Sequence, residues 1–321
     1  MYTPDSNRYN QSEGFYRRCG RSGVLLPRVS LGFWHNFGAV DPLERSRAIT
    51  HYAFDHGITH FDLANNYGPP YGSAETTLGT LMQQDFAPHR HELFISTKAG
   101  YDMWPGPYGN WGSRKYLITS LDQSLERMHL DYVDLFYSHR YDPNTPLEET
   151  LQALVDVVHA GKALYVGISR WPIEATKLAV GYLREQHVPL LAYQGKLNLI
   201  SPEPVTSGLL SLLEREGVGF TGFSPLQQGL LTNRYLHGIP ADSRMGHGRL
   251  RPELLTPELR AKLLQWSRVA QGLGISLAQL ALAWVLQHRQ VTTVIVGASR
   301  VEQLADDLNA LSVGKLPEIE L

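Results

Sequence analysis

Short apolar runs alternate with segments of helical hydrophobic spacing along most of the chain. In residues 145–160, for example, Leu147, Leu151 and Leu154 recur on one helical face. Strands and helices that alternate in this way favour a parallel sheet, and eight strands favour closure into a (β/α)8 TIM barrel. The eight predicted strands are 29–31, 59–63, 93–97, 133–137, 163–168, 190–193, 219–223 and 294–296.

Two of the intervening helices carry clear start signals. Asp41, Pro42 and Glu44 have the order of an N-cap acid, a proline at the first helical position and an early glutamate. Thr145 and Pro146 repeat that order ahead of a later helix. The sequence therefore predicts a side-chain cap at each of these two helix starts.

Three intervals depart from the alternation. Residues 16–27 predict a hairpin ahead of the barrel, and 224–256 form a long loop after the seventh strand, rich in Gly, Pro and Arg. Two consecutive helices, 257–272 and 276–288, precede the last strand. No flexible linker or change of composition divides the chain, so residues 1–321 are expected to form a single barrel domain.

Charge and cysteine content narrow the choice of partners. Lys plus Arg total 29 and Asp plus Glu total 31, with no block of like charge, which disfavours nucleic acid and membrane surfaces. Cys19 is the only cysteine, so an internal disulfide and a Cys-based metal cluster are excluded. His89 and His91 have no further ligand at useful spacing, and no metal is assigned. With a polar N-terminus and no apolar run of ~20 residues, the chain is expected to be cytoplasmic and to act on a small molecule.

Reactive side chains stand where the predicted strands end. Asp62 ends the second strand, Lys98 follows the third, His139 follows the fourth, and Tyr67 lies on the loop after Asp62. Because the carboxyl ends of barrel strands form the active site of such folds, these four side chains are expected to converge. Lys98 would lower the pKa of the Tyr67 phenol so that it can donate a proton, with Asp62 as the counter-ion. His139 would bind and orient a carbonyl oxygen.

The same residues have plainer interpretations. Asp62 and Lys98 also fit a structural ion pair, His139 fits a buried core histidine, and Tyr67 fits a half-buried loop aromatic. All of these coincidences would have to occur together at neighbouring strand ends, so the sequence favours a carbonyl-reducing site.

Several motifs resemble one known family. Residues 57–68 read Gly-Ile-Thr-His-Phe-Asp-Leu-Ala-Asn-Asn-Tyr-Gly, residues 95–98 read Ile-Ser-Thr-Lys, and residues 134–139 read Asp-Leu-Phe-Tyr-Ser-His. In order and spacing, from about residue 16 to 311, the chain resembles the aldo-keto reductase superfamily. The catalytic tetrad of that superfamily then falls on Asp62, Tyr67, Lys98 and His139.

A narrower likeness is carried by residues 31–38, 99–109 and 229–232. These segments resemble a branch that contains bacterial L-glyceraldehyde 3-phosphate reductases and potassium-channel β subunits. Channel subunits of this kind often carry Asn where this chain has His139, so the resemblance implies catalysis rather than regulation alone. Relatives in the branch form tetramers or larger rings, which suggests a homo-oligomer by analogy.

The resemblance also implies NADPH/NADP+ as the cofactor. Ser169, Arg170 and Gln194 would hold the nicotinamide carboxamide, and Phe223 would stack on the ring where many relatives have Tyr or Trp. The loop 224–256 would fold over the dinucleotide. The residues expected to contact the cofactor are Trp34, Asp62, Ser169, Arg170, Gln194, Phe223, Ser224, Leu226, Gln228, Gly229, Arg234, Arg244, Gly297, Ser299, Arg300, Gln303, Asp306 and Asp307.

The last residues of this set would bind the adenosine part. Arg300 beside Ser299 would contact a 2′-phosphate, which favours NADPH over NADH. Without the resemblance, Ser299 and Glu302 fit an ordinary capping box at the start of a helix over 301–311. Asp307 stands where relatives usually have Asn.

The substrate would lie beside the nicotinamide, among aromatic side chains. Trp34, Trp104, Tyr71 and Tyr108 would form an aromatic wall, or alternatively cover the barrel rim. Arg140 would anchor a phosphate or carboxylate on the substrate. The residues expected at the substrate are Trp34, Tyr67, Trp104, His139 and Arg140.

These expectations define two functions from different classes. The first is NADPH-dependent reduction of small, phosphorylated or aromatic aldehydes, such as glyceraldehyde 3-phosphate and methylglyoxal, with Tyr67 as the general acid. The alternative is an NADPH-binding regulatory or interaction subunit with little turnover, which the presence of His139 disfavours.

Overall fold

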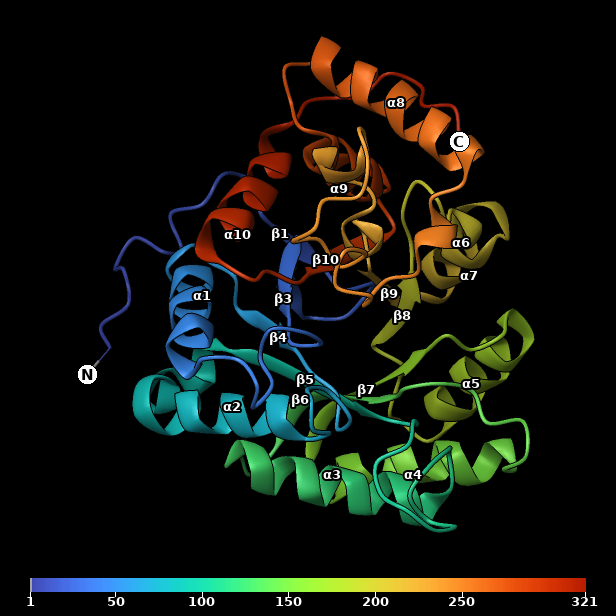
Figure 1. The fold of residues 1–321 in the computed structure, drawn as a ribbon. Coiled ribbons are helices and arrows are strands. Elements are labelled where there is room, and N and C mark those ends of the chain that lie inside the picture. Colours follow the sequence, from blue (N-terminus) through green and yellow to red (C-terminus); the bar gives the residue numbers. More distant parts are fainter. Residues whose placement is uncertain (1) are drawn as a thin grey trace.

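The computed structural model describes residues 2–321, which form a closed barrel of parallel strands surrounded by helices (Figure 1). Its strands are β3 (Val29–Gly32), β4 (His60–Asp62), β5 (Phe94–Ala99), β6 (Val133–Ser138), β7 (Ala163–Ser169), β8 (Ala192–Lys196), β9 (Gly219–Phe223) and β10 (Val291–Val296). They follow one another around the barrel in chain order, and β10 closes on β3. The predicted (β/α)8 barrel is confirmed.

The helices lie outside the barrel, and most bury one face. They are α1 (Leu43–Asp55), α2 (Ser73–Leu81), α3 (Arg114–Met128), α4 (Leu147–His159), α5 (Ile173–Glu185), α6 (Glu203–Thr206), α7 (Leu209–Glu216), α8 (Pro257–Gly272), α9 (Leu277–Gln287) and α10 (Val301–Leu308). In α4 the face predicted from the apolar spacing is the buried one, with Leu151, Leu154 and Val155 inaccessible. By contrast, α9 is buried on nearly all sides.

The barrel interior is polar toward the carboxyl ends of its strands. Side chains alternate between the two faces of a strand, so His60 and Asp62 of β4 share the inner face, as do Ser96 and Lys98 of β5. All four are at most 2 % exposed. The large apolar cluster lies instead between the barrel and its helices.

The predicted N-terminal hairpin is confirmed, and it covers the amino-terminal end of the barrel. Strand β1 (Tyr16–Arg18) pairs antiparallel with β2 (Leu25–Pro27). Arg17 donates to the backbone oxygen of Val291, where β10 begins, and the buried Cys19 Sγ lies 3.5 Å from the oxygen of Leu191, just before β8. The opposite end, where the strands terminate, is left to the loops.

The predicted side-chain caps of α1 and α4 are wrong. Pro42 and Pro146 themselves occupy the N-cap positions, and neither helix has a side-chain cap hydrogen bond. A proline at the cap moves the preceding Asp41 and Thr145 one residue too far from the free N–H groups of the first turn. Thr145 donates instead to Asp142.

Element boundaries shift where polar residues face the barrel interior. The sixth barrel strand was expected to end at residue 193, but β8 continues through Gln194 to Lys196. Lys98 likewise lies within β5 rather than after it.

The last predicted helix is shorter than expected, because α10 ends at Leu308 and gives way to a 3₁₀ turn.

Residues 2–321 contain neither a single helix that could span a membrane nor a cluster of potential metal ligands. No single helix there has both the length and the apolar composition to cross a membrane, and α8 and α9 meet those criteria only as a pair, bent by 87°. Within the same residues, no group of three or more His, Cys, Asp or Glu side chains is placed to hold a metal ion.

Candidate active site

Asp62, Lys98 and Tyr67 meet at the carboxyl ends of β4 and β5. The Nζ of Lys98 lies 2.6 Å from Oδ2 of Asp62 and 3.4 Å from the Tyr67 hydroxyl, and it also donates to the backbone oxygen of Leu63. All three N–H groups of the ammonium are therefore used. Lys98 is fully buried, and the close carboxylate compensates its charge.

A chain of buried hydrogen bonds extends from this ion pair across the barrel. Ser96 donates to Oδ1 of Asp62 at 2.8 Å, His60 bridges Ser96 and Ser30 at 2.9 and 2.8 Å, and Ser30 contacts Thr293 at 2.6 Å. A carboxylate can only accept, so Ser96 accepts in turn from Nε2 of His60, and Nδ1 accepts from Ser30. Burial lowers the pKa of His60 to about 4, which keeps this tautomer uncharged at neutral pH.

Sequence reasoning misses His60 and Ser96. Their signal is periodic: each stands two residues before a catalytic candidate on the same face of its strand.

Tyr67 keeps its proton, contrary to the effect expected of Lys98. Burial, followed by the nearby Asp62 and Tyr101, raises the pKa of Tyr67 well above its ordinary value. The expected lowering is wrong because Asp62 neutralises Lys98, so a phenolate would face an ion pair rather than a free ammonium. Since Lys98 donates to the phenol oxygen, the proton of Tyr67 remains free for another acceptor.

His139 is buried and uncharged. Burial, followed by the positive charges of Lys98, Arg170 and Arg140, holds the pKa of His139 well below its ordinary value. The ring lies edge-on to that of Tyr67, with 5.9 Å between centroids, and no other group in residues 2–321 hydrogen-bonds its buried Nδ1. An uncharged imidazole with an unpaired nitrogen suits the binding of a substrate oxygen.

Tyr101 connects the ends of three strands, although nothing in the sequence marks it as a site residue. Its ring lies edge-on to His139, with 4.7 Å between centroids. Its hydroxyl accepts a hydrogen bond from Nη1 of Arg170 at 3.1 Å, and the guanidinium of Arg140 lies 4.4 Å from its ring centre. Tyr101 therefore touches the loops that follow β6 and β7 as well as its own.

Arg140, the expected substrate anchor, is held by the loop between β5 and α3. Its Nε donates to the backbone oxygen of Gly100 at 2.7 Å, and Nη2 donates to Asn110 at 2.6 Å. The guanidinium also lies 3.5 Å from the ring centre of Trp111. These contacts favour a role in positioning the loop over direct binding of a substrate phosphate.

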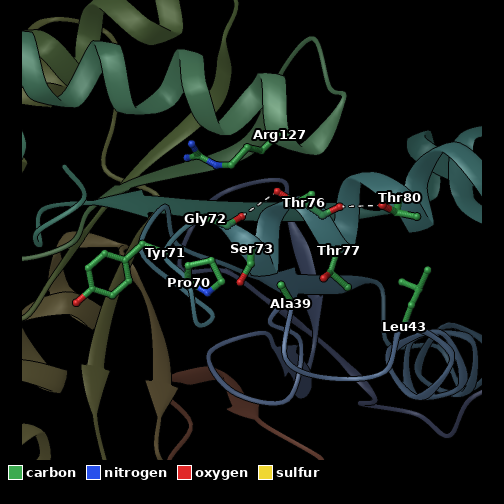
Figure 2. A pocket seen from close by; sticks show the side chains of 10 residues that line it. All are labelled: Ala39, Leu43, Pro70, Tyr71, Gly72, Ser73, Thr76, Thr77, Thr80 and Arg127. Atoms are coloured by element: carbon green, nitrogen blue, oxygen red, sulfur yellow. Dashed lines mark hydrogen bonds between the residues drawn. The ribbon is translucent and has the colours of Figure 1, made fainter.

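The four side chains of the expected aromatic wall lie in different settings. Trp34 and Tyr108 are exposed, whereas Trp104 packs on α3. Tyr71 lines a surface pocket of about 320 Å³ together with residues at the starts of α1 and α2 (Figure 2). None of Asp62, Tyr67, Lys98 and His139 lines that pocket.

Two residues expected at the nicotinamide are adjacent on paired strands. Ser169 pairs in register with Gln194, and Nε2 of Gln194 donates to Oδ1 of Asp62 at 3.0 Å. Phe223, the residue expected to stack on the ring, ends β9 and is half-buried. The side chain of Arg170 is bonded to Tyr101 instead of to either strand.

The loop after β9 begins with an uncommon backbone. Ser224, Gln227 and Gln228 have φ values of 54°, 46° and 56°. Residues other than glycine rarely adopt this left-handed conformation. Such strain is typical of segments that hold a ligand. Several N–H groups of this segment are already bonded within the loop, since those of Gln227 and Gly229 donate to the backbone oxygens of Ser224 and Leu226.

The two arginines of this loop differ in their pairing. Arg234 forms an ion pair with Asp242 at 2.5 Å. Arg244 is half-buried and has no ion-pair partner within residues 2–321, and burial lowers its pKa. Burial, then the charges of Arg244 and Arg249, lower the pKa of His35 to about 4, so this loop lies close to the one after β3.

The segment before α10 forms no capping box with Glu302. Ser299 instead donates to the side-chain oxygen of Gln303, through its hydroxyl at 2.9 Å and its backbone N–H at 2.8 Å. Arg300 is exposed at the N-cap position. Asp307 is 5 % exposed, and burial raises its pKa to about 8, so its carboxyl group is largely protonated at neutral pH and can donate as an amide does.

Comparison with known proteins agrees with this geometry. Residues 28–321 match the model of the Aldo/keto reductase family. The chain is 55 % identical over 317 residues to an L-glyceraldehyde 3-phosphate reductase of Escherichia coli (strain K12), covering 97 % of this chain and 91 % of the relative. It is 34 % identical over 305 residues to a probable voltage-gated potassium channel subunit beta of Arabidopsis thaliana (93 % and 91 % covered). The corresponding subunit of Oryza sativa subsp. japonica is 36 % identical over 313 residues (95 % and 94 % covered).

Proposed function

The chain belongs to the aldo/keto reductase family, and on that premise we propose that it reduces small aldehydes to alcohols with NADPH. One observation carries the proposal: a protonated Tyr67, the ion pair of Lys98 with Asp62, and an uncharged His139 meet at one end of the barrel. Each group has the protonation state that reduction of a carbonyl needs at neutral pH.

NADPH suits the residues around this site. The strained segment with Ser224, Gln227 and Gln228 would lie along the pyrophosphate, and Arg244, which has no ion-pair partner among residues 2–321, would contact it. Ser169 and Gln194 would hold the carboxamide, and Arg300 would contact a 2′-phosphate, which NADH lacks. When bound, the nicotinamide ring supplies the hydride that adds to the carbonyl carbon.

The side chains of the tetrad orient the carbonyl oxygen of the substrate and supply its proton. His139 donates a hydrogen bond to the carbonyl oxygen and directs it toward Tyr67. An alkoxide is about as basic as hydroxide, whose conjugate acid has a pKa of about 15.7, so it takes the Tyr67 proton even though the pKa of that phenol is raised. Lys98, which donates a hydrogen bond to the Tyr67 oxygen, would keep that bond to the phenolate, and Asp62 holds Lys98 in place.

Phosphorylated three-carbon aldehydes are the substrates we propose first, alongside methylglyoxal and aromatic aldehydes. The name of the 55 % identical relative supports this class, and Arg140 and Arg170 lie around His139. The test is NADPH oxidation by the purified protein with a panel of these aldehydes, with NADH as the comparison. We expect faster oxidation of NADPH than of NADH. Tight NADPH binding without reduction of any aldehyde would contradict the proposed activity and support the binding-subunit alternative.

A further inference from the structure

Three positively charged side chains stand at the ends of consecutive barrel strands. Arg140 and Arg170 follow β6 and β7 closely, and Lys196 is the last residue of β8. None of the three is in an ion pair within 4.0 Å among residues 2–321. Like charges this close destabilise one another, and the charge of Arg170 adds to burial in lowering the pKa of Lys196.

Lys196 lies on the inner face of the barrel mouth. It follows Gln194 by two residues on the same strand, and Gln194 reaches into the barrel to bond Asp62. Because side chains alternate along a strand, Lys196 shares the face of Gln194 and lies about 7 Å nearer the carboxyl end. It is half-buried, so its charge is partly withdrawn from water.

Arg170 is joined to the catalytic centre through one residue. Its Nη1 bonds the hydroxyl of Tyr101, whose ring contacts His139. The positive charge of Arg170 is close enough to contribute to the lowered pKa of His139.

The three cationic side chains differ in how many hydrogen bonds they already make within the protein. Arg140 is bonded to Gly100 and Asn110, and Arg170 to Tyr101. The ammonium of Lys196 has no hydrogen bond to any part of the chain from residue 2 onward. Glu203, whose charge acts against the lowering of the Lys196 pKa, is not within ion-pair distance. Uncompensated cations with free N–H groups are the usual binding groups for phosphate.

We propose that Lys196 and Arg170, with the hydroxyl of Tyr101, form an anion-binding subsite for the phosphate of a phosphorylated aldehyde. The inference rests on the proposed reductase function, because it assumes that the carbonyl of the same molecule lies between Tyr67 and His139. It assigns recognition of the anion to the ends of β7 and β8, while Arg140 positions the neighbouring loop.

The test is the Lys196→Gln variant, assayed with glyceraldehyde 3-phosphate and with glyceraldehyde. We expect KM for the phosphorylated aldehyde to rise about tenfold or more, the usual effect of losing one charge-assisted hydrogen bond. KM for glyceraldehyde and Kd for NADPH should stay within about twofold. Lys196→Arg should retain the wild-type preference, and Lys177→Gln, on the exposed side of α5, should change neither constant.

Equal changes of KM for the two aldehydes would overturn the subsite, and a selective rise in Kd for NADPH would assign Lys196 to the cofactor instead. A wild-type protein that reduces no aldehyde would refute the proposed function but not the subsite. In that case, calorimetric titration with glycerol 3-phosphate in the presence of NADP+ still decides: weaker binding by Lys196→Gln supports the subsite, and equal binding refutes it.

Discussion

Asp62 bonds to buried polar residues around it, whose protonation states are set first by burial. Its carboxylate accepts hydrogen bonds from Lys98 and Ser96, and the close contact with Lys98 leaves little net charge to act on Tyr67. The convergence of Asp62, Tyr67 and Lys98 follows from their places at strand ends and is predictable from the sequence. The direction of the Tyr67 pKa is not, because it depends on how far apart the charges lie.

His60 is expected to act through Ser96 on the position of Asp62. His60→Leu removes both ring nitrogens from the buried chain of hydrogen bonds, so Ser96 can turn away from the carboxylate. We predict a fall in kcat of about tenfold, equivalent to about 1.4 kcal/mol, with little change in KM. Steady-state kinetics and a melting curve would check this. An unchanged kcat in a folded variant would show that the chain is structural only.

Asp307 is expected to make stability depend on pH. Its pKa is about 8 in the folded protein and about 3.9 in an unfolded chain, so the folded state binds the extra proton between these values. The free energy of unfolding should therefore fall as pH rises from about 4 to 8. Asp307→Asn should remove that slope and stabilise the protein at pH 8 by up to roughly 5 kcal/mol. Urea unfolding at pH 5 and pH 8 measures this change in the free energy of unfolding. An equal change between the two pH values in the wild-type protein and in Asp307→Asn would contradict a buried, protonated Asp307.

Among the elements, the sequence predicts apolar buried faces well and misassigns polar residues that face the barrel interior. Apolar faces such as that of α4 are read correctly. Gln194 and Lys196 resemble loop residues in sequence but belong to β8, since this barrel has a polar interior near its mouth. The cap predictions fail for a local reason, because Pro42 and Pro146 take the cap positions themselves.

The loop between β5 and α3 depends on Arg140 for its position. Arg140→Ala removes the hydrogen bonds to Gly100 and Asn110 and the contacts with Tyr101 and Trp111. We predict a lower melting temperature and a similar rise in KM for charged and uncharged aldehydes, because the whole loop beside His139 is loosened. A rise confined to phosphorylated aldehydes would instead restore Arg140 as the direct anchor suggested by the sequence.

At the scale of the whole molecule, barrel closure gathers the chemistry at one end. The parallel strands bring residues that are far apart in sequence, such as Asp62 and Gln194, into hydrogen-bond contact, while the hairpin covers the other end. Eight strand signals predict this architecture, and the strand-end rule predicts the tetrad. The proposed roles of Tyr101 and Lys196 are not predictable in this way, because they depend on loop conformation and on charges left without partners.

We propose that Tyr67 supplies the proton for carbonyl reduction. The most direct test is Tyr67→Phe, measured by NADPH titration and by single-turnover reduction of glyceraldehyde, with Tyr71→Phe as a control four residues away on the same loop. We predict an unchanged Kd for NADPH and a rate lower by about 10²- to 10⁴-fold in Tyr67→Phe, with the control close to wild type. Turnover at the wild-type rate in Tyr67→Phe would contradict the role of Tyr67 as the proton donor.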